Sequence, residues 1–491
     1  MVGESIVRLE PLVRSMAVLL DPLAQTLCAS DGGLERETRV LSHAAGASES
    51  LPRQDALLLA FGLFVARCQA GESASKYAQR VLSADVASAR PRLRETLSPL
   101  RRIVQRSTEG ESVVRELVTL LAHTDLTPVL KEASEAGCTE YPLVYFFEVL
   151  LAESDARLRR GRGVYFTPQP LVQYMVRSVD ALLRRALSLE GGLNSTDPKL
   201  RVVDPACGSG AFLLDILKFV RLSCTGPSGA SRWRHLASHV LRERLAGIDL
   251  MPACCGAIQL LLEHETAGDS CLSIDNDDVT GEQRWEMHCG NALEDNAVIE
   301  SIFEDRIPVI VGNPPYANFG RRNRTGWILE QLKEYKSRLN ERKLNLDDDF
   351  IKFLRWAQFW VEQAGCGVVA MVTNSTYLAG LTHRRMRASL ARTFDEIYIL
   401  DLHGNPKMQG PGGEHVADQN VFPIQQGVAI GMFVKRGLSR TADSPSVFYS
   451  QLRGSRGDKF DTLSNSDVCR TKWTRLKPVD PYHFFVPRDE E

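Results

Sequence analysis

The sequence lacks several features that mark common protein classes. Its eleven cysteines are irregularly spaced and include no Cys-x-x-Cys pair, so we expect neither a disulfide framework nor a bound structural metal. Its longest apolar run, Ala56 to Ala66, is much shorter than the roughly 20 apolar residues that cross a membrane. The N-terminus shows no small-residue cleavage site after an apolar core. We therefore expect a soluble, intracellular protein without a signal peptide or a membrane partner.

An excess of charge of one sign is also absent. Lysine and arginine number 59, aspartate and glutamate number 61, and the formal net charge is −2. This balance excludes a histone-like protein that binds nucleic acid through bulk charge, but it is compatible with a local basic groove. The 491 residues, of which 44% are hydrophobic, suffice for about three domains with their own cores.

The first third of the chain has the apolar spacing of helices, as at Leu117, Leu120 and Leu121. Residues 140–153 predict a strongly apolar helix that ends in a charged stretch. No motif for chemistry stands out before residue 158. We interpret residues 1–158 as a helical scaffold.

From about residue 200, predicted strands alternate with predicted helices, which favours an α/β fold with a Rossmann-like, doubly wound parallel sheet. The expected strands cover residues 200–204, 245–249, 286–289, 308–312, 367–373, 396–400 and 427–434. The expected helices cover residues 210–220, 253–264, 347–363 and 381–392. Residues 438–491 are polar without convincing periodicity, and we expect a tail or the start of a truncated region.

A glycine turn follows the first strand and opens a helix. It reads Asp204-Pro205-Ala206-Cys207-Gly208-Ser209-Gly210-Ala211-Phe212. Two glycines let the backbone approach a ligand and expose amide groups at a helix N-terminus, which favours a carboxylate or a phosphate. Leu213 stands where a dinucleotide fingerprint needs its third glycine, so a nicotinamide site is the weaker alternative. Because Asp204 could accept from an ammonium group, an amino-acid moiety fits best, and a turn without a ligand stays open as an alternative.

Two more positions complete this hypothesis. Asp249 closes the second strand, where an acidic residue commonly binds two ribose hydroxyls, and an ordinary strand-end cap is the alternative. Upstream, Tyr165-Phe166-Thr167-Pro168 precedes a predicted helix. We expect Thr167 to be its N-cap and Pro168 its first helical residue.

The fourth strand runs directly into Asn313-Pro314-Pro315-Tyr316. Two prolines stiffen this loop, and Pro314 restricts Asn313 to extended angles. The loop would present the Asn313 side-chain oxygen and the Pro314 carbonyl beside an aromatic ring. A flat ring with an exocyclic amine, such as adenine, would suit these acceptors, whereas a rigid turn with a packed tyrosine is the alternative.

These motifs resemble, in the same order, those of N6-adenine DNA methyltransferases of the gamma arrangement. The resemblance extends to the methyltransferase part of type ISP and type IIG-like restriction–modification enzymes and covers about residues 140–437. Its supporting segments are residues 159–165, 348–353, 394–405 and 420–430. A member of this family would be a cytoplasmic enzyme of a bacterium or an archaeon that methylates adenine in phage defence.

The resemblance implies S-adenosylmethionine as the cofactor. It implies cofactor-binding roles for Tyr165, Thr167, Pro168, Asp204, Pro205, Ala206, Gly208, Gly210, Phe212, Asp249, Asn291 and Ala292. Many relatives have aspartate where this chain has Asn291, which keeps a carbonyl acceptor but no charge.

The resemblance also implies the catalytic loop and the path of the substrate. Asn313, Pro314, Pro315 and Tyr316 would form the catalytic motif, in which Asn313 and the Pro314 carbonyl accept hydrogen bonds from the target amine. The adenine would have to flip out of double-stranded DNA. Tyr316 would stack on one face of the base and Phe422 on the other, although a core role for Phe422 is equally compatible.

Basic residues follow two of the sheet motifs. We expect DNA-backbone contacts from Arg321, Arg322, Arg324, Arg384 and Arg385. Arg387 and Arg392 belong to the second of these clusters, and solvated helix faces are the alternative for both clusters.

The nuclease and motor of type ISP relatives have no counterpart in the sequence, which contains no Gly-Lys dipeptide and therefore no P-loop of the helicase kind. The expected domains are a helical, coupler-like domain (1–158), a methyltransferase domain (159–437) and a tail or the start of a target-recognition region (438–491). A separate specificity, helicase or nuclease chain is an expected partner. Two alternatives remain: a non-catalytic subunit that binds cofactor and DNA, and an RNA or protein glutamine methyltransferase.

Overall fold

The computed structural model describes residues 7–29, 51–69, 74–83, 91–137, 139–154, 167–267, 285–294, 297–316, 326–339, 341, 346–404, 418–437 and 445–488. The chain divides into two compact units. The first comprises residues 1–160, 208–214 and 248–291, and the second comprises residues 161–207, 215–247 and 292–491. Among the helices described, none combines the length and the apolar character needed to cross a bilayer.

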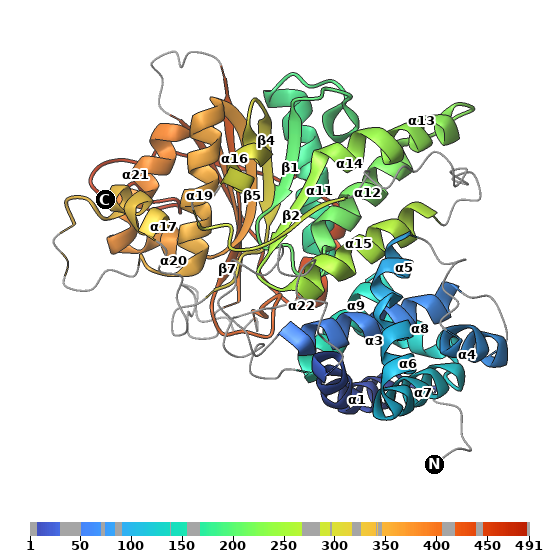
Figure 1. Ribbon diagram of the computed structural model, residues 1–491. Helices are drawn as coiled ribbons and strands as arrows, with labels where there is room; N and C mark the ends of the chain where they lie inside the picture. The colour runs from blue at the N-terminus through green and yellow to red at the C-terminus, as the bar shows by residue number, and fades with distance from the viewer. Residues whose placement is uncertain are drawn as a thin grey trace. The chain divides into compact units, whose positions relative to one another are not determined.

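Helices dominate the N-terminal third, as expected. They are α1 (Leu9–Ala29), α3 (Leu51–Gln69), α4 (Ala74–Leu82), α5 (Pro91–Leu97), α6 (Pro99–Arg106), α7 (Thr108–Ala122), α8 (Leu126–Gly137) and α9 (Pro142–Ser154). Figure 1 shows these helices gathered in blue to teal. Phenylalanines of α3 and α9 form their core: Phe64 stacks on Phe146 with ring centroids 3.6 Å apart, and Phe61 lies 5.0 Å from Phe147.

Helix α9 is apolar nearly all round, and such a helix is stable only inside a core. Phe146, Phe147 and Leu150 are fully buried on it. The same unit contains α15 (Pro252–Ala267) and β3 (Glu286–Cys289). Helix α15 packs against α3, where Gly256 lies so close to Leu58 that a Cβ would come within 2.4 Å of it.

The remaining strands are β1 (Leu200–Asp204), β2 (Leu245–Asp249), β4 (Ile307–Gly312), β5 (Cys366–Asn374), β6 (Glu396–His403), β7 (Val428–Arg436), β8 (Ser446–Gln451) and β9 (Thr474–Leu476). The helices between them are α11 (Gln169–Ala186), α12 (Ala211–Ser223), α13 (Gly229–His235), α14 (Leu241–Arg244), α16 (Ala297–Phe303), α17 (Gly326–Gln331), α18 (Lys333–Lys336), α19 (Asp349–Ala364), α20 (Thr376–Ala379), α21 (Arg384–Thr393) and α22 (Arg456–Ser464). The expected strands at 200–204, 245–249 and 286–289 match these bounds to the residue, because each is a short run between turn residues.

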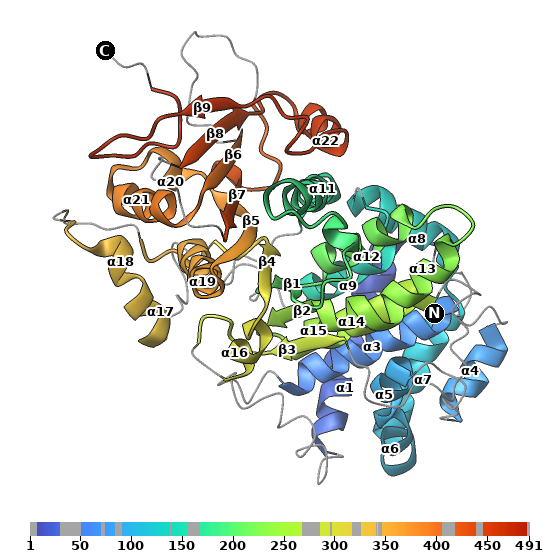
Figure 2. The ribbon, with the colours of Figure 1, turned by 90° about the horizontal axis from the view of Figure 1, so that it is seen from above.

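The nine strands lie in the order β3-β2-β1-β4-β5-β7-β6-β8-β9. Strand β1 pairs in parallel with β2 and β4, and β4 pairs in parallel with β5. The fold is therefore mixed α/β with a Rossmann-like sheet. Figure 2 shows α19 and α21 on one face of its β4–β8 part and α11 and α22 on the other.

Strand β7 departs from the expected parallel sheet. It lies between β5 and β6 and is antiparallel to both. Parallel neighbours need a long crossover, usually a helix, whereas antiparallel neighbours need only a loop. The sequence between β6 and β7 carries no helical pattern, which is the physical reason for the antiparallel strand.

The segment after residue 437 is more regular than its composition suggests. Strand β8 pairs in parallel with β6, and β9 pairs antiparallel with β8, so both strands extend the sheet. Val447 and Tyr449 of β8 point into the core, while their neighbours along the strand are more exposed. Strands this short gave no clear periodicity in the sequence. Whether residues 438–491 begin a target-recognition region remains a prediction.

The central strands set the stability of the second unit. Val309 of β4 is fully buried, whereas Val298 of α16 is 48% exposed. Val309→Ala should lower the free energy of unfolding by about 2 kcal/mol, because it removes buried methyl groups and leaves a cavity. Val298→Ala is the matched control, and urea denaturation of both variants measures the difference. Equal effects of the two substitutions would contradict this account of the core.

Candidate active site

The Asn-Pro-Pro-Tyr loop begins where β4 meets β1. Gly312 ends β4, and a Cβ placed on it would lie 2.9 Å from Oδ1 of Asp204, the last residue of β1. Asp204 is only 1% exposed, and its Oδ1 accepts from the amide of Ala206 at 3.1 Å. Glycine at position 312 therefore lets the Asn-Pro-Pro-Tyr loop start beside a buried carboxylate.

Asn313 is held by two hydrogen bonds that orient its amide. Its Nδ2 donates to Oγ1 of Thr167 at 3.0 Å, and the Tyr316 hydroxyl donates to its Oδ1 at 2.9 Å. In this arrangement the Thr167 hydroxyl accepts from the amide nitrogen and the Tyr316 hydroxyl donates to the amide oxygen, although a hydroxyl can do either. The Asn313 oxygen is therefore presented on the Tyr316 side of the loop. Pro314, next in the chain, is buried, and Pro315 and Tyr316 are half-buried.

The predicted N-cap role of Thr167 is wrong. Helix α11 begins after Pro168, which is itself the N-cap residue with φ −55° and ψ 136°, and no side chain caps the helix. The extended conformation of Pro168 sets Thr167 outside the helix. The Thr167 hydroxyl instead supports Asn313, a role that sequence spacing could not reveal because the two residues are 146 positions apart.

Tyr316 has a fixed ring and a protonated hydroxyl. Burial, and then the nearby Asp348, raise the pKa of the Tyr316 hydroxyl well above its ordinary value, so it is a hydrogen-bond donor at neutral pH. Its ring and that of Phe350 of α19 form a T-shaped pair, with centroids 6.2 Å apart and an interplanar angle of 89°. Phe350 thus limits the positions that the Tyr316 ring can take.

The two glycines of the turn lie in the first unit together with Asp249. Gly208 has φ +53°, its amide donates to Oδ2 of Asp249 at 3.0 Å, and a Cβ there would meet nothing within 4 Å. Gly210 has φ +85°, and a Cβ on it would come within 2.8 Å of Ile258. The turn therefore needs glycine at position 210 for close packing and leaves open space at position 208.

Asp249 uses both carboxylate oxygens in this unit. Its Oδ1 accepts from the amide of Met251 at 2.8 Å, and its Oδ2 accepts from Gly208. Asn291 follows β3 and is half-buried, whereas Phe212 and Ala292 are 2% exposed and belong to the core. Of the other expected cofactor residues, Pro205 is buried and Ala206 is half-buried, and Tyr165 lies outside the described residues.

Sequence reasoning missed Glu148. This residue lies on α9, and its Oε1 accepts from the hydroxyl of Ser209 in the glycine turn. Burial raises the pKa of Glu148 to about 8, although the hydrogen bond from Ser209 opposes that rise. Glu148 is the one acidic residue in the apolar run Pro142 to Ala152. This isolated charge is the sequence feature that could have pointed to its role. Glu148 connects the helical scaffold to the turn.

Phe422 is buried, with 1% of its surface exposed, and its amide donates to Oδ1 of Asn420 at 2.9 Å. The core role that the sequence left open fits this position. A stacking role would require Phe422 to become accessible, and it remains a prediction.

The expected DNA-backbone residues have different surroundings. Arg384 pairs with Glu341, and Arg392 of the same helix pairs with Glu334, so acidic side chains partly neutralise this basic cluster. Arg385 is half-buried. Arg321, Arg322 and Arg324 lie outside the described residues. Contacts of these arginines with DNA remain a prediction.

Arg387 differs from its neighbours on α21 because it is fully buried. It donates to the carbonyls of Tyr377 and Gly380 at 2.6 and 2.8 Å, and to those of Tyr482 and His483 at 2.5 to 3.0 Å. This arginine therefore fastens the C-terminal segment to the turn after β5.

The sheet order, the glycine turn after β1 and the Asn-Pro-Pro-Tyr loop after β4 define a Rossmann-like methyltransferase. A comparison with protein families agrees. The model of the N-6 DNA methylase family matches residues 143–387, about half of the chain. The chain belongs to the N-6 DNA methylase family.

Three solved structures share the fold over nearly the whole chain. A DrdV–DNA complex has 20% sequence identity and a TM-score of 0.68, and the match covers 98% of this chain and 46% of that one. The ATP-dependent type ISP restriction–modification enzyme LlaBIII bound to DNA has 18% identity and a TM-score of 0.65. The match covers 97% of this chain and 32% of LlaBIII. A nuclease-deletion mutant of the type ISP enzyme LlaGI with a DNA substrate mimic has 17% identity and a TM-score of 0.64, covering 97% and 44%. The chain thus spans less than half of each of these longer chains.

The raised pKa of the Glu148 carboxyl makes stability depend on pH. Because its pKa in the folded protein is raised, its protonated form favours folding below the unfolded pKa, and this contribution is lost as pH rises through about 8. The Glu148→Gln side chain has no carboxyl group and therefore does not become charged in this pH range. Its melting temperature should therefore rise relative to that of the wild type between about pH 5 and pH 8.

Differential scanning calorimetry across this range measures the effect. Glu153→Gln, on the exposed side of the same helix, is the matched control. Parallel curves for the wild type and Glu148→Gln would contradict the raised pKa.

Proposed function

We propose that this chain is the methyltransferase part of a restriction–modification enzyme and that it transfers a methyl group from S-adenosylmethionine to N6 of a specific adenine in double-stranded DNA. The single observation that supports the proposal most is that two hydrogen bonds hold the side-chain amide of Asn313 in place. In a chain of this family, Thr167 and Tyr316 keep an acceptor oxygen in one orientation before any substrate arrives. Two type ISP restriction–modification enzymes in complexes with DNA or a DNA substrate mimic share the fold, which supports the choice of DNA as substrate.

The residues of the glycine turn fit the proposed cofactor. Gly208 offers space and a positive φ, and the turn opens α12, whose first amides favour a carboxylate. We assign the buried Asp204 to the methionine ammonium, Asp249 to the ribose hydroxyls and Asn291 to the adenine of the cofactor. When bound, S-adenosylmethionine supplies an electrophilic sulfonium methyl group.

The chain's own residues would then make the target amine a nucleophile. The lone pair of an adenine amine is delocalised into the ring, so the amine attacks poorly unless its hydrogens are held out of the ring plane. Asn313 Oδ1 and the Pro314 carbonyl are the proposed acceptors. The Tyr316 hydroxyl occupies Asn313 Oδ1 at 2.9 Å, so the incoming amine would share or take over that oxygen. Preorganised acceptors of this kind would supply most of the acceleration.

The proposal extends to partners and location. We propose that the chain acts in the cytoplasm, and that sequence choice and cleavage depend on further protein, either attached or separate. Arg321, Arg322, Arg324, Arg384 and Arg385 are the proposed contacts to the DNA backbone, and Phe422 with Tyr316 the proposed partners of the flipped base.

The direct test is transfer of labelled methyl from S-adenosylmethionine to DNA that lacks adenine methylation, followed by nucleoside analysis. N6-methyladenine is the expected product. Cofactor binding without transfer to any DNA would contradict the proposal and favour a subunit that only binds.

Asn313→Ala should lower kcat about 100-fold or more, because it removes a preorganised acceptor worth roughly 3 kcal/mol. Its cofactor affinity, measured by calorimetry, should stay close to that of the wild type. Tyr316→Phe is the matched comparison: it keeps the ring, removes only the hydroxyl on Asn313 and should cost less. A variant without Asn313 that keeps more than about a tenth of the wild-type rate would sink the assignment.

Asp204→Ala should weaken cofactor binding roughly tenfold or more, because a buried carboxylate would no longer meet the ammonium group. Asp21→Ala, at a side chain that is 61% exposed on α1, is the control. Isothermal calorimetry gives both affinities, and thermal melting shows whether the variants fold. An unchanged dissociation constant for a folded Asp204→Ala protein would remove this residue from the cofactor site.

A further inference from the structure

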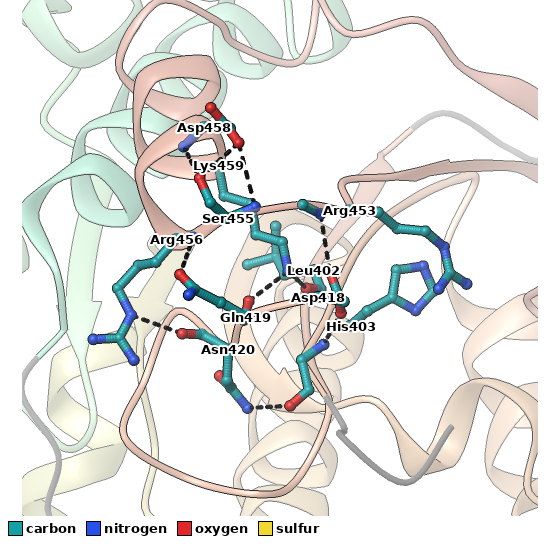
Figure 3. Close-up of polar contacts among 12 residues, drawn as sticks. Leu402, His403, Asp418, Gln419, Asn420, Arg453, Ser455, Arg456, Asp458 and Lys459 are labelled. Carbon is teal, nitrogen blue, oxygen red and sulfur yellow. Dashed lines mark hydrogen bonds and ion pairs between the residues drawn. The ribbon is translucent and has the colours of Figure 1, made fainter. Parts of the chain in front are cut away.

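A polar cluster of the second unit centres on Lys459 of α22 (Figure 3). This lysine is only 1% exposed, although it lies on a short surface helix. Its Nζ donates to the carbonyls of Leu402 and Gln419 at 2.8 and 2.7 Å and pairs with Oδ1 of Asp418 at 2.8 Å. All three ammonium protons therefore have partners.

Asp418 is the acceptor at the middle of the cluster. Besides Lys459, it accepts from the amide of Gly404 through Oδ2 at 2.7 Å and from that of Gly454 through Oδ1 at 3.1 Å. Burial alone would raise the pKa of Asp418, but the hydrogen bonds from Lys459 and the two glycine amides outweigh it, and the pKa is lowered. The carboxylate is therefore charged at neutral pH and joins β6, the loop after residue 418 and the C-terminal segment.

The loop that follows, residues 420–427, is shaped by the same segment. Asn420 donates through Nδ2 to the carbonyls of Gly404 and Gln426 at 3.2 and 2.7 Å, so its side chain spans the loop. Arg456, the first residue of α22, donates through Nε to the Asn420 carbonyl at 2.8 Å and through its amide to Oε1 of Gln419 at 2.9 Å. The first residue of α22 thus hydrogen-bonds to the beginning of this loop.

The far end of the loop reaches the sheet edge of the catalytic motif. Asn374, the last residue of β5, donates to Oε1 of Gln426 at 2.8 Å, and the amide of Ser375 donates to the Gly427 carbonyl at 2.9 Å. Strand β5 pairs in parallel with β4, with Met371 opposite Gly312, so both strands end at the edge where Asn313 follows. The loop held by Lys459 therefore ends beside the neighbour of the Asn-Pro-Pro-Tyr strand.

Attaching a helix through a buried lysine costs free energy. Removing its charge from water carries a large penalty, and apolar residues of similar volume often replace buried ion pairs without loss of stability. Hydrogen bonds are directional, whereas apolar contacts are not. The three bonds of Lys459 therefore hold two carbonyl groups and one carboxylate in a single arrangement. We infer that this arrangement fixes the shape of the loop 420–427, in addition to attaching α22.

We propose that Lys459 is a positioning residue for methyl transfer: through Asp418 and Gln419 it holds the loop 420–427 in the shape that receives the extrahelical adenine. The inference rests on the proposed function, because it names the support of the same site. It also makes α22, which lies beyond the expected methyltransferase boundary at residue 437, a working part of the methyltransferase.

The test uses the full chain and two single variants, Lys459→Met and Asp418→Asn, with the double variant. Lys131→Met, on an exposed side chain of α8, is the matched control. The methylation pattern that the wild type leaves on DNA supplies the target sequence. A duplex with 2-aminopurine at the target adenine then reports base flipping by fluorescence, alongside kcat, the KM for DNA, and cofactor affinity by calorimetry.

For Lys459→Met we expect kcat to fall about tenfold or more and the fluorescence rise to be lost, because small displacements of a substrate-holding loop have large effects on rate. Cofactor affinity should change less than about twofold, since the loop is not assigned to the cofactor. Hydrogen exchange of the amides in residues 420–427 should be faster than in the wild type. Lys131→Met should match the wild type in every readout.

The double variant separates positioning from stability. It leaves no unpaired carboxylate, so it should regain melting temperature relative to Lys459→Met while remaining about tenfold or more below the wild type in kcat. Recovery of both melting temperature and kcat would overturn the proposal, because Lys459 would then only balance a charge. A normal fluorescence rise with Lys459→Met would overturn it too. A wild type that makes no N6-methyladenine overturns the proposed function, and the role of Lys459 with it.

Discussion

Parallel pairing of β1, β4 and β5 is the constraint on which the arrangement of the second unit depends. Val203 pairs with Ile310, and Gly312 pairs with Met371, so the three strands run in one direction and their carboxyl ends lie at the same edge. The carboxyl ends of parallel strands are where α/β sheets bind ligands. A shift of one residue in β4 would turn every side chain of the strand to the other face and would remove Gly312 from its place beside Asp204.

Buried charges recur where loops must keep one shape. Arg387 and Lys459 are each 1% exposed or less, and both donate mainly to backbone carbonyls of distant segments. Arg244 is a third case: it is 3% exposed and donates to the carbonyls of Leu193 and Ser195. Burial lowers the pKa of Arg387 and of Arg244 to about 10 without removing their charge at neutral pH. Each cation donates to backbone carbonyls of distant segments, which stabilises the backbone around the sheet.

The strands and the two motif loops were predictable because their signals are local. A short apolar run between turn residues needs no partner to be recognised, and this held for β1, β2 and β3. The role of Thr167 was not predictable in the same way: its sequence context favoured an N-cap, but the backbone of Pro168 and the distant Asn313 decided its hydrogen bond. Strand β8 escaped notice because its pairing with β6, not its own pattern, makes it a strand.

The sequence by itself determined the mixed α/β fold, the order of its motifs and the family, because glycine turns, proline loops and apolar runs act through neighbouring residues. Only the tertiary structure decided how side chains far apart in the chain meet. Asn313 and Thr167 are 146 positions apart, Glu148 and Ser209 are 61 apart, and Lys459 and Leu402 are 57 apart. Such pairs depend on packing over the whole unit, because a hydrogen bond needs its two atoms within about 3 Å and no sequence pattern encodes that separation.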